Sequence, residues 1–356
     1  MSDAHHPARY WHAEGARYRC EVCPRACVVS PGQAAFCTVR VGGEHGMELT
    51  TYGRSSGFCI DPIEKKPLHH FYPGTPILSF GTAGCNLGCQ FCQNWDISKA
   101  RHDDALQAQA SPAAIARTAV QVGAKSVAFT YNDPTIFLEY AIDTAEECRK
   151  LGVHPVAVTN GYIHGAARVD LYATMDAANI DLKAFTEKFY RDVCSAHIEP
   201  VKETLKHVVK HSSCWVEITT LLIPGYNDSD AEIEELSTWI AAELSPDVPL
   251  HFSAFHPDYK LMDAPATPPA TLTRARAIAR RAGLRYVYTG NVHDPAGAST
   301  YCPSCDALLV ERDWYTLGQW HLREGACEQC GTRVAGRFDP DPGQWGARRQ
   351  PLRIVA

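Results

Sequence analysis

Short apolar runs alternate with longer amphipathic stretches through the middle of the chain. The short runs predict buried strands at 77–81, 126–130, 154–159, 178–182, 215–223, 250–255 and 285–288. Apolar residues three and four apart predict helices at 112–122, 136–151, 230–244 and 271–282. Ser111 and Pro112 suit a helix start, and Gly152 and Gly283 suit helix ends. This alternation predicts an α/β fold.

Strands that alternate with helices form parallel βαβ units. About six or seven such units predict an open or partial (β/α) barrel, with its functional residues on loops at the carboxyl ends of the strands. Unusual residues do follow the predicted strands, at 85–92, 131–133, 159–161, 181–183, 223–225 and 256. Loops are generally polar, but that tendency does not explain a cysteine cluster in the first of them.

The flanking regions lack this alternation. Residues 1–74 are rich in Gly, Pro, His and Cys, and residues 294–356 have the composition of a small loop-rich module. We therefore expect three parts: a Cys-rich metal-binding segment at 1–74, the barrel at 75–293, and a zinc-ribbon-like module at 294–356.

Composition is that of a soluble globular protein, with 45% apolar and 21% charged residues. The formal net charge of -6 argues against nucleic-acid binding driven by bulk charge. The polar start Met-Ser-Asp-Ala-His-His-Pro predicts no signal peptide, and no apolar run is long enough to span a bilayer. We expect a cytoplasmic protein with no membrane partner.

Fifteen cysteines are unusual for such a chain, and an odd number cannot all pair within it. In a reducing compartment, clustered cysteines usually bind metal. Eleven of them form three groups, of four, three and four. The others are expected to be small buried hydrophobic residues: Cys59, Cys148, Cys194 and Cys214.

Cys85, Cys89 and Cys92 follow the first predicted strand, with three and two residues between them. Thiolates suit iron–sulfur clusters or zinc, and structural zinc takes four ligands. No fourth cysteine or histidine is close in the sequence, so a [4Fe–4S] cluster with one open iron is favoured. A zinc site completed from elsewhere and a redox pair of Cys89 with Cys92 are the alternatives.

This CxxxCxxC motif, with Phe91 before its last cysteine, resembles the radical S-adenosylmethionine (SAM) superfamily. Further segments resemble the AmmeMemoRadiSam-system radical SAM enzymes, which are related to pyruvate formate-lyase activating enzyme. These segments are 61–74, 93–98, 130–135, 181–183, 221–228 and 251–257. The resemblance covers residues 18–338 and implies a partial (β/α)6 radical SAM barrel.

The resemblance implies that three cysteines hold a [4Fe–4S] cluster and that SAM chelates its open iron. Reductive cleavage of SAM would give a 5′-deoxyadenosyl radical, which abstracts hydrogen from an unidentified substrate. A flavodoxin or ferredoxin would supply the electron, and Memo-type and Ammecr-type proteins would be functionally linked. Alternatives are a glycyl-radical-enzyme activating enzyme and, from another class, a non-catalytic zinc-binding scaffold or nucleic-acid-binding protein.

The resemblance also implies which residues contact SAM. Phe91 is expected near the adenine. Tyr131, Asn132 and Asp133 stand where many members have Gly-Gly-Glu, so this loop is expected to bind the SAM amino group. Further contacts are expected from Asn160, Asp181, Lys183 and His256. Each of these, taken alone, has an ordinary structural alternative, such as an ion pair between Asp181 and Lys183.

Two four-cysteine groups flank the predicted barrel. The C-terminal group consists of two CxxC pairs separated by 21 residues, at Cys302, Cys305, Cys327 and Cys330. This spacing predicts a zinc site, with a rubredoxin-type iron as the alternative. The N-terminal group is Cys20, Cys23, Cys27 and Cys37, for which zinc and a second iron–sulfur cluster both remain open.

The run of charged residues at 61–67 immediately precedes the barrel and contains Glu64, Lys65 and Lys66. A solvated turn is the expectation for such a run. The alternative is a segment that covers the mouth of the active site.

Overall fold

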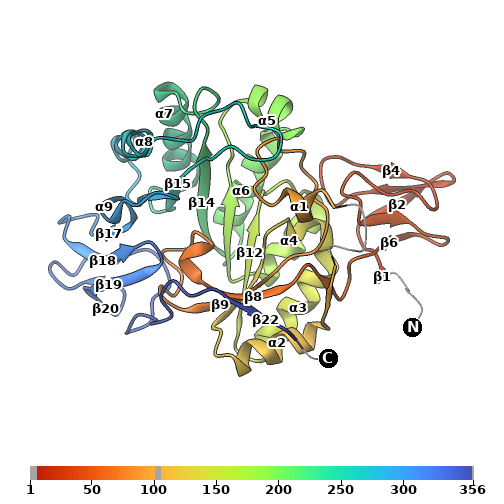
Figure 1. Cartoon of the computed structure of the whole chain (residues 1–356), viewed down its shortest axis with the longest axis horizontal. Coiled ribbons are helices and arrows are strands. Elements are labelled where there is room, and N and C mark those ends of the chain that lie inside the picture. Colours follow the sequence, from red (N-terminus) through yellow and green to blue (C-terminus); the bar gives the residue numbers. More distant parts are fainter. Residues whose placement is uncertain (1–5, 101–105, 355–356) are drawn as a thin grey trace.

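A nine-stranded sheet runs through the centre of the molecule (Figure 1). The computed structural model describes residues 6–100 and 106–354. Residues 1–5, on which part of the signal-peptide expectation rests, lie outside the described residues. In spatial order the strands are β16 (Val287–Gly290), β15 (Leu250–Ala254), β14 (Trp215–Leu222), β13 (Ala177–Asp181), β12 (His154–Thr159), β11 (Ser126–Phe129), β9 (Pro76–Phe80), β8 (Phe58–Pro62) and β22 (Gln350–Leu352).

Neighbouring strands from β9 to β16 are all parallel, and their spatial order follows their order in the chain. At the β9 edge, β8 pairs antiparallel with β9, and β22 pairs antiparallel with β8. The prediction of an α/β fold with a parallel sheet is therefore confirmed. Curvature of this sheet into a partial (β/α)6 barrel stays a prediction.

Helices connect the parallel strands, because parallel neighbours need a crossover connection between them. The predicted helices are observed as α2 (Pro112–Gln121), α3 (Leu138–Lys150), α7 (Asp230–Trp239) with the π-helix η4 (Ile240–Leu244), and α8 (Pro269–Arg281). The Ser111 hydroxyl caps α2 as expected, accepting from the backbone N–H of Ala114 at 3.3 Å. The remaining helical elements are η1 (Ile63–Lys65), α1 (Trp95–Ser98), η3 (Pro134–Phe137), α4 (Gly165–Thr174), α5 (Glu187–Cys194), α6 (Glu199–His211) and α9 (Pro295–Ala298).

The longest helix that the sequence prediction missed is α6. It buries Val201, Leu205 and Val208. Their spacing of four and three residues is the signal that could have found this helix.

The two faces of the sheet pack against different partners, because successive strand residues point to opposite sides. Leu78 and Phe80 of β9 join the same apolar cluster as Tyr140 of α3, so this face carries the helices. The opposite face, which includes Ile77 and Val156, packs against a segment that precedes the first parallel strand.

We call residues 61–75 the covering segment. It lies against the amino-terminal ends of the parallel strands, in a cluster of Ile63, Leu68, Phe71, Ile77, Ala128, Val156 and Ala177. The expected solvated turn at 61–67 is wrong, because Asp61, Glu64 and Lys66 are all buried. Asp61 and Lys66 compensate each other, since Lys66 Nζ lies 2.7 Å from Asp61 Oδ2, and Glu64 Oε1 accepts from the backbone N–H of Gly74.

Glu217 of β14 is the polar centre beneath the covering segment. Its carboxylate accepts from the backbone N–H groups of His69 (3.0 Å) and His70 (2.7 Å). It also lies 2.7 Å from Nε2 of His251. A carboxylate buried in this way needs such partners, and it in turn satisfies two buried backbone donors.

The flanking regions form small sheets at opposite ends of the central sheet (Figure 1). The N-terminal sheets consist of β1 (His6–Pro7), β6 (Met47–Leu49) and β5 (Arg40–Gly42), and of β2 (Trp11–Glu14), β3 (Arg17–Cys20) and β4 (Val28–Val29). β7 (Arg54–Ser55) pairs with β10 (Ala108–Gln109). The C-terminal sheets consist of β17 (Thr300–Tyr301), β18 (Leu308–Asp313) and β19 (Thr316–Trp320), and of β20 (Leu322–Arg323) and β21 (Ala326–Cys327).

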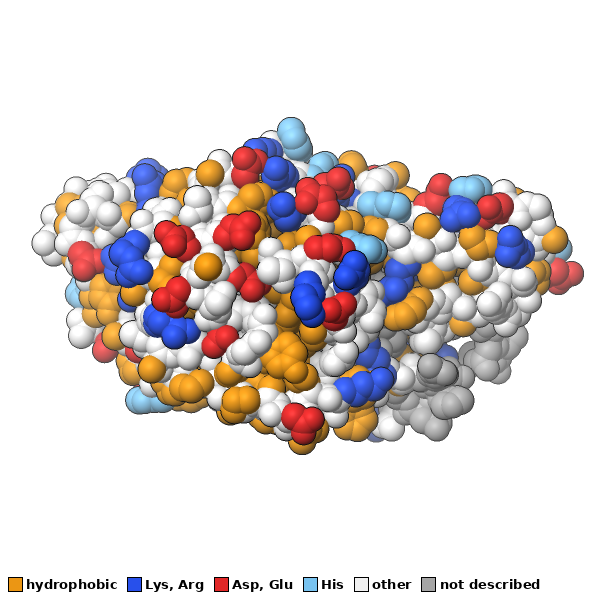
Figure 2. All heavy atoms as spheres, turned by 90° about the horizontal axis from the view of Figure 1, so that it is seen from above, with side chains coloured by type: hydrophobic (Ala, Val, Ile, Leu, Met, Phe, Trp, Pro, Cys, Tyr) orange, Lys and Arg blue, Asp and Glu red, His pale blue; other side chains and the backbone are white. Residues whose placement is uncertain are grey.

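Basic and acidic side chains are interspersed on the face shown in Figure 2. Among the described residues, no helix is long and apolar enough to cross a membrane.

The buried histidines of the covering segment make folding sensitive to acid. Burial lowers the pKa of His70 to about 4 and that of His69 well below its usual value. The unfolded chain therefore binds protons below pH 6.5 that the folded chain does not, and stability is lost as the pH falls from about 6.5 toward 4. Each histidine contributes at most about 1.4 kcal/mol per pH unit.

We expect His69→Leu to flatten this pH dependence, because it removes one of the two histidines whose pKa is lowered. Leucine is a suitable replacement, since Nδ1 of His69 is buried without a hydrogen-bond partner. The measurement is the free energy of unfolding in urea between pH 8 and pH 5. The exposed His293→Gln is the matched control and should keep the slope of the unsubstituted chain. An equal slope in His69→Leu would contradict the assignment.

Candidate active site

The loop with three cysteines begins directly after β9 and is fastened by a neighbouring strand end. The side-chain amide of Asn132, after β11, donates to the Thr82 hydroxyl (3.0 Å) and the Gly84 carbonyl (3.1 Å). Its oxygen accepts from the backbone N–H of Thr82 at 3.1 Å. Lys99 Nζ donates to the Leu87 carbonyl of the same loop at 2.6 Å. The amide of Asn132 therefore holds the cysteine loop, and its contact with SAM stays a prediction.

The three thiols have different surroundings. Burial, followed by the nearby Asp133, raises the pKa of Cys85 to about 12. A hydrogen bond with Cys194 and the positive charge of Lys183 lower the pKa of Cys89. Cys92 Sγ lies 3.1 Å from the Ser98 hydroxyl. A bound cation would deprotonate such thiols, and thiolates are the ligands that iron–sulfur clusters require.

Asp133 places Asn160 beside this loop. The buried Asp133 carboxylate accepts from the Thr159 hydroxyl (3.0 Å) and from the backbone N–H of Asn160 (2.7 Å). Nδ2 of Asn160 then lies 3.9 Å from Cys85 Sγ and 2.9 Å from Asn86 Oδ1. Desolvation raises the pKa of Asp133, and these donors oppose that effect. Asn160 is thus brought to the cysteines, and Asp133 is its support.

Lys183 and Asp181 approach the loop from the end of β13. Lys183 Nζ lies 2.7 Å from Asp181 Oδ2 and 5.8 Å from the ring centre of Phe91. Burial disfavours its charge, but Asp181 and the Cys89 thiol together raise the pKa of Lys183 well above its usual value. The structure therefore brings three of the predicted residues together near Cys89: Phe91, Asp181 and Lys183.

Tyr131 and His256 lie differently. Tyr131 has a positive φ of 70°, and its hydroxyl donates to Asp61 of the covering segment at 2.9 Å. His256 is exposed, and its Nδ1 lies 3.4 Å from the Pro257 carbonyl. In the described chain, no hydrogen bond connects His256 to the other predicted site residues.

The C-terminal cysteines form a compact metal-binding group. The ligand atoms of Cys302, Cys305, Cys327 and Cys330 all lie within 4.8 Å of one another. The Cys302 and Cys330 sulfurs are 3.5 Å apart, and those of Cys305 and Cys327 are 3.8 Å apart. A tetrahedral ion with metal–sulfur bonds of about 2.3 Å separates its sulfurs by about 3.8 Å. The geometry fits one ion held by four thiolates.

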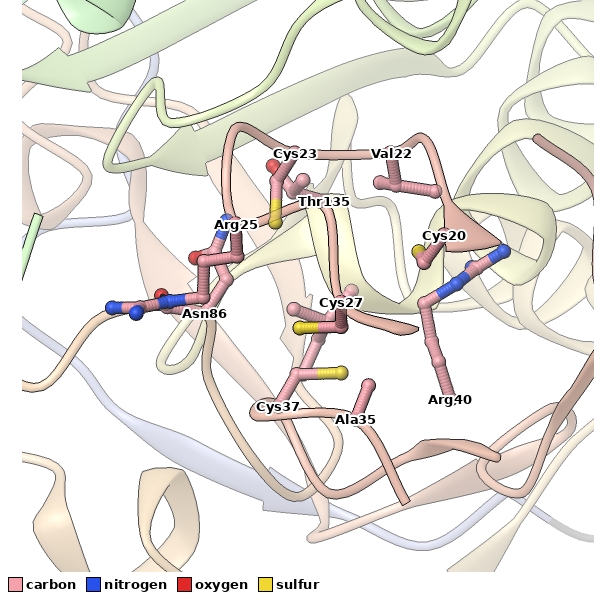
Figure 3. A pocket seen from close by; sticks show the side chains of 11 residues that line it. Cys20, Val22, Cys23, Arg25, Cys27, Ala35, Cys37, Arg40, Asn86 and Thr135 are labelled. Carbon is pink, nitrogen blue, oxygen red and sulfur yellow. Dashed lines mark hydrogen bonds between the residues drawn. The ribbon is translucent and has the colours of Figure 1, made fainter. Parts of the chain in front are cut away.

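The N-terminal cysteines surround one pocket, in which they are joined by two arginines (Figure 3). Its lining is Cys20, Val22, Cys23, Arg25, Cys27, Ala35, Cys37, Arg40, Asn86, Thr135 and Ile136. Asn86 belongs to the cysteine loop after β9, so this pocket adjoins the candidate active site.

Sequence reasoning missed several residues of this region. Cys194 is buried, as expected, but it also contacts the cysteine loop, where its carbonyl accepts from the backbone N–H of Gly88 at 2.8 Å. Lys99 directly follows the segment 93–98 that carried part of the resemblance, so that motif offered a signal for it. For Cys194 and Arg25 no sequence signal exists, because both reach the loop from distant parts of the chain.

Residues 80–236 match the radical SAM superfamily, a range that includes the three-cysteine loop and the ends of five parallel strands. A protein of Methanocaldococcus jannaschii is 40% identical over 327 residues, which cover 91% of this chain and 97% of that protein. Pyruvate formate-lyase 1-activating enzyme of Escherichia coli is 20% identical over 232 residues, covering 61% of this chain and 93% of the enzyme.

Among solved structures, Streptococcus suis SuiB bound to the precursor peptide SuiA superposes with a TM-score of 0.50 and 16% identity. The match covers 65% of this chain and 52% of SuiB, and it bears on the fold alone. The family match over residues 80–236 agrees with the cysteine loop at the end of the first parallel strand. The chain belongs to the radical SAM superfamily.

Proposed function

We propose that this protein cleaves SAM reductively and uses the resulting 5′-deoxyadenosyl radical to abstract hydrogen from a substrate. Radical SAM membership implies an enzyme that uses a [4Fe–4S] cluster and SAM radical chemistry. The observation that carries the proposal is the arrangement around Cys85, Cys89 and Cys92. A charged lysine and a carboxamide from neighbouring strand ends both face this thiol set.

The residues of this chain fit the group that the family implies. Cys85, Cys89 and Cys92 are the proposed thiol ligands of the cluster, since all three lie in one loop and are buried or half-buried from solvent. Lys183, oriented by Asp181, is placed to bind an anionic group of the cofactor, and a carboxylate is one that SAM presents. Phe91 offers a flat apolar surface, and its ring packs on Phe189. The covering segment closes the sheet at the opposite end of the strands, which excludes water from that side.

The finer assignments belong to the same proposal. We propose that the parallel sheet curves as a partial barrel and that a flavodoxin or ferredoxin supplies the electron. Assignment to the AmmeMemoRadiSam system, with its link to Memo-type and Ammecr-type proteins, rests on the sequence motifs alone. We also propose the boundaries 1–74, 75–293 and 294–356 as the three parts of the chain.

Activation of a glycyl-radical enzyme is a second candidate. The similarity to pyruvate formate-lyase 1-activating enzyme supports it, since the match covers 93% of that enzyme. The identity of 20% is low, so a different substrate is equally compatible with the shared fold. The two candidates differ in whether the hydrogen is taken from a protein backbone.

Replacement of Cys85, Cys89 or Cys92 by Ala is expected to reduce 5′-deoxyadenosine formation to background, because the cluster loses a ligand. The assay uses anaerobically reconstituted, reduced protein and measures 5′-deoxyadenosine by chromatography. Cys148→Ala is the matched control, since this buried cysteine lies in α3, away from the loop. Undiminished product in the three loop variants would refute the proposal.

Lys183→Met is expected to raise the SAM concentration for half-maximal cleavage about tenfold or more, because a charge-assisted hydrogen bond contributes about 1.5–3 kcal/mol. The iron content should not change, which separates cofactor binding from cluster loss. Lys188→Met, at an exposed position of α5, should leave the SAM dependence unaltered. An unshifted SAM dependence in Lys183→Met would remove this lysine from the cofactor site.

We propose that the C-terminal four-cysteine group holds zinc. Replacing Cys302 and Cys327 together by Ser is expected to remove one zinc per chain and to lower the melting temperature, because metal binding there contributes to folding. Plasma mass spectrometry gives the metal content, and Cys214→Ala serves as the control. Loss of one iron without loss of zinc would instead identify a rubredoxin-type site.

A further inference from the structure

Four cysteines from three turns of the N-terminal region converge on one pocket (Figure 3). Cys20 ends β3, Cys27 precedes β4, and Cys37 lies three residues before β5. Cys23 lies in the turn between β3 and β4. In Figure 3 the Cys27 and Cys37 sulfurs point into the same space, and the Cys23 sulfur points toward it from above. The pocket is partly open to solvent.

These thiols are spread more widely than the C-terminal four. Among the residues that the structure describes, the C-terminal group alone has its potential ligand atoms within 4.8 Å of one another. Four thiolates on one tetrahedral ion must approach to about 3.8 Å. The N-terminal thiols instead leave room between them, as a cluster of several iron and sulfide ions requires.

The pocket also supplies positive charge and a free hydrogen-bond donor. Arg40 is buried, and its guanidinium lies beside Cys20 (Figure 3). Its two Nη atoms are used, since they donate to the Glu139 carboxylate at 2.8 and 3.0 Å and to the Arg9 carbonyl. Its Nε has no hydrogen-bond partner although it is buried. A cluster held by four thiolates is anionic, and its sulfur atoms accept hydrogen bonds.

The pocket touches the loop of the first cluster. A Cβ at Gly84 would lie only 2.1 Å from the Cys37 carbonyl oxygen, so the two backbones are in contact next to Cys85. Arg25, which lines the pocket, donates to the Asn86 carbonyl at 2.5 Å and also to the Ser195 carbonyl. One wall is therefore shared by the two cysteine sets.

We propose that Cys20, Cys23, Cys27 and Cys37 bind a second iron–sulfur cluster of the [4Fe–4S] type, adjacent to the loop of Cys85, Cys89 and Cys92. Arg40 partly neutralises this cluster, and Glu139 orients Arg40. Zinc is the competing occupant, and it would have to draw the four sulfurs together. The inference is independent of the proposed SAM chemistry, since it concerns a different set of thiols.

The test removes the first site and asks what iron remains. Full-length protein with Cys85, Cys89 and Cys92 all replaced by Ala is reconstituted anaerobically with iron and sulfide. We expect about four irons and four sulfides per chain, visible iron–sulfur absorption, and an electron paramagnetic resonance signal after reduction. A chain with no sulfide and two zinc ions would overturn the proposal, since zinc would then occupy both four-cysteine groups.

The reciprocal variant replaces Cys23 and Cys37 by Ser in the otherwise unaltered chain. It should lose about half of the iron and sulfide while Cys85, Cys89 and Cys92 still bind their cluster. Undiminished iron in this variant would overturn the proposal. Because the N-terminal turns depend on these residues, Arg40→Lys is the milder variant: it keeps the charge but alters the donors. We expect it to retain the iron and to shift the reduction potential of the second cluster, and an unshifted potential would count against contact between Arg40 and the cluster.

Discussion

Two adjacent polar residues, Asn132 and Asp133, connect three consecutive strand-end loops, and the candidate active site depends on that connection. Asn132 binds the backbone of the loop after β9, and Asp133 binds the loop after β12. Both lie in the loop after β11. Leaving a buried amide or carboxylate without its hydrogen bonds costs free energy, so these bonds hold the three loops in fixed positions relative to one another. The result places Asn160 against Cys85 before any cofactor binds.

The covering segment imposes the complementary constraint at the other end of the strands. It contacts the first residues of several strands, such as Ala177 and Trp215, and it brings its own charges into the interior. Glu217 accepts from two buried backbone N–H groups of the segment, and Asp61 and Lys66 pair with each other within it. Further along the same face, Asp181 and Leu221 remain partly exposed. The partly exposed residues of this face therefore lie near the carboxyl ends of the strands. The cysteine loop begins at this same end of the sheet, after β9.

The spacing of the thiols distinguishes the cysteine groups chemically. The C-terminal four are close enough for one ion, whereas the N-terminal four line a pocket and are accompanied by buried arginine. The loop after β9 offers three thiols and a nearby lysine, an arrangement suited to a cluster with an open coordination position. The backbones of Gly84 and Cys37 are in contact, so the two cysteine-bearing regions pack directly together. A residue with a side chain would not fit at position 84 for this reason.

The sequence by itself determined the parallel α/β core, the positions of its seven parallel strands and the cysteine grouping, because these depend on local periodicity and spacing. It also predicted the cap of α2, which is a local hydrogen bond. Only the tertiary structure showed that Asp61, Glu64 and Lys66 are buried, that Cys194 contacts the loop at Gly88 and that Arg25 binds it at Asn86. These interactions join residues far apart in the chain, and local patterns carry no information about such pairs. The hydrogen bonds of Asn132 and Asp133 to neighbouring loops are of the same kind, and the contact of these residues with SAM stays a prediction.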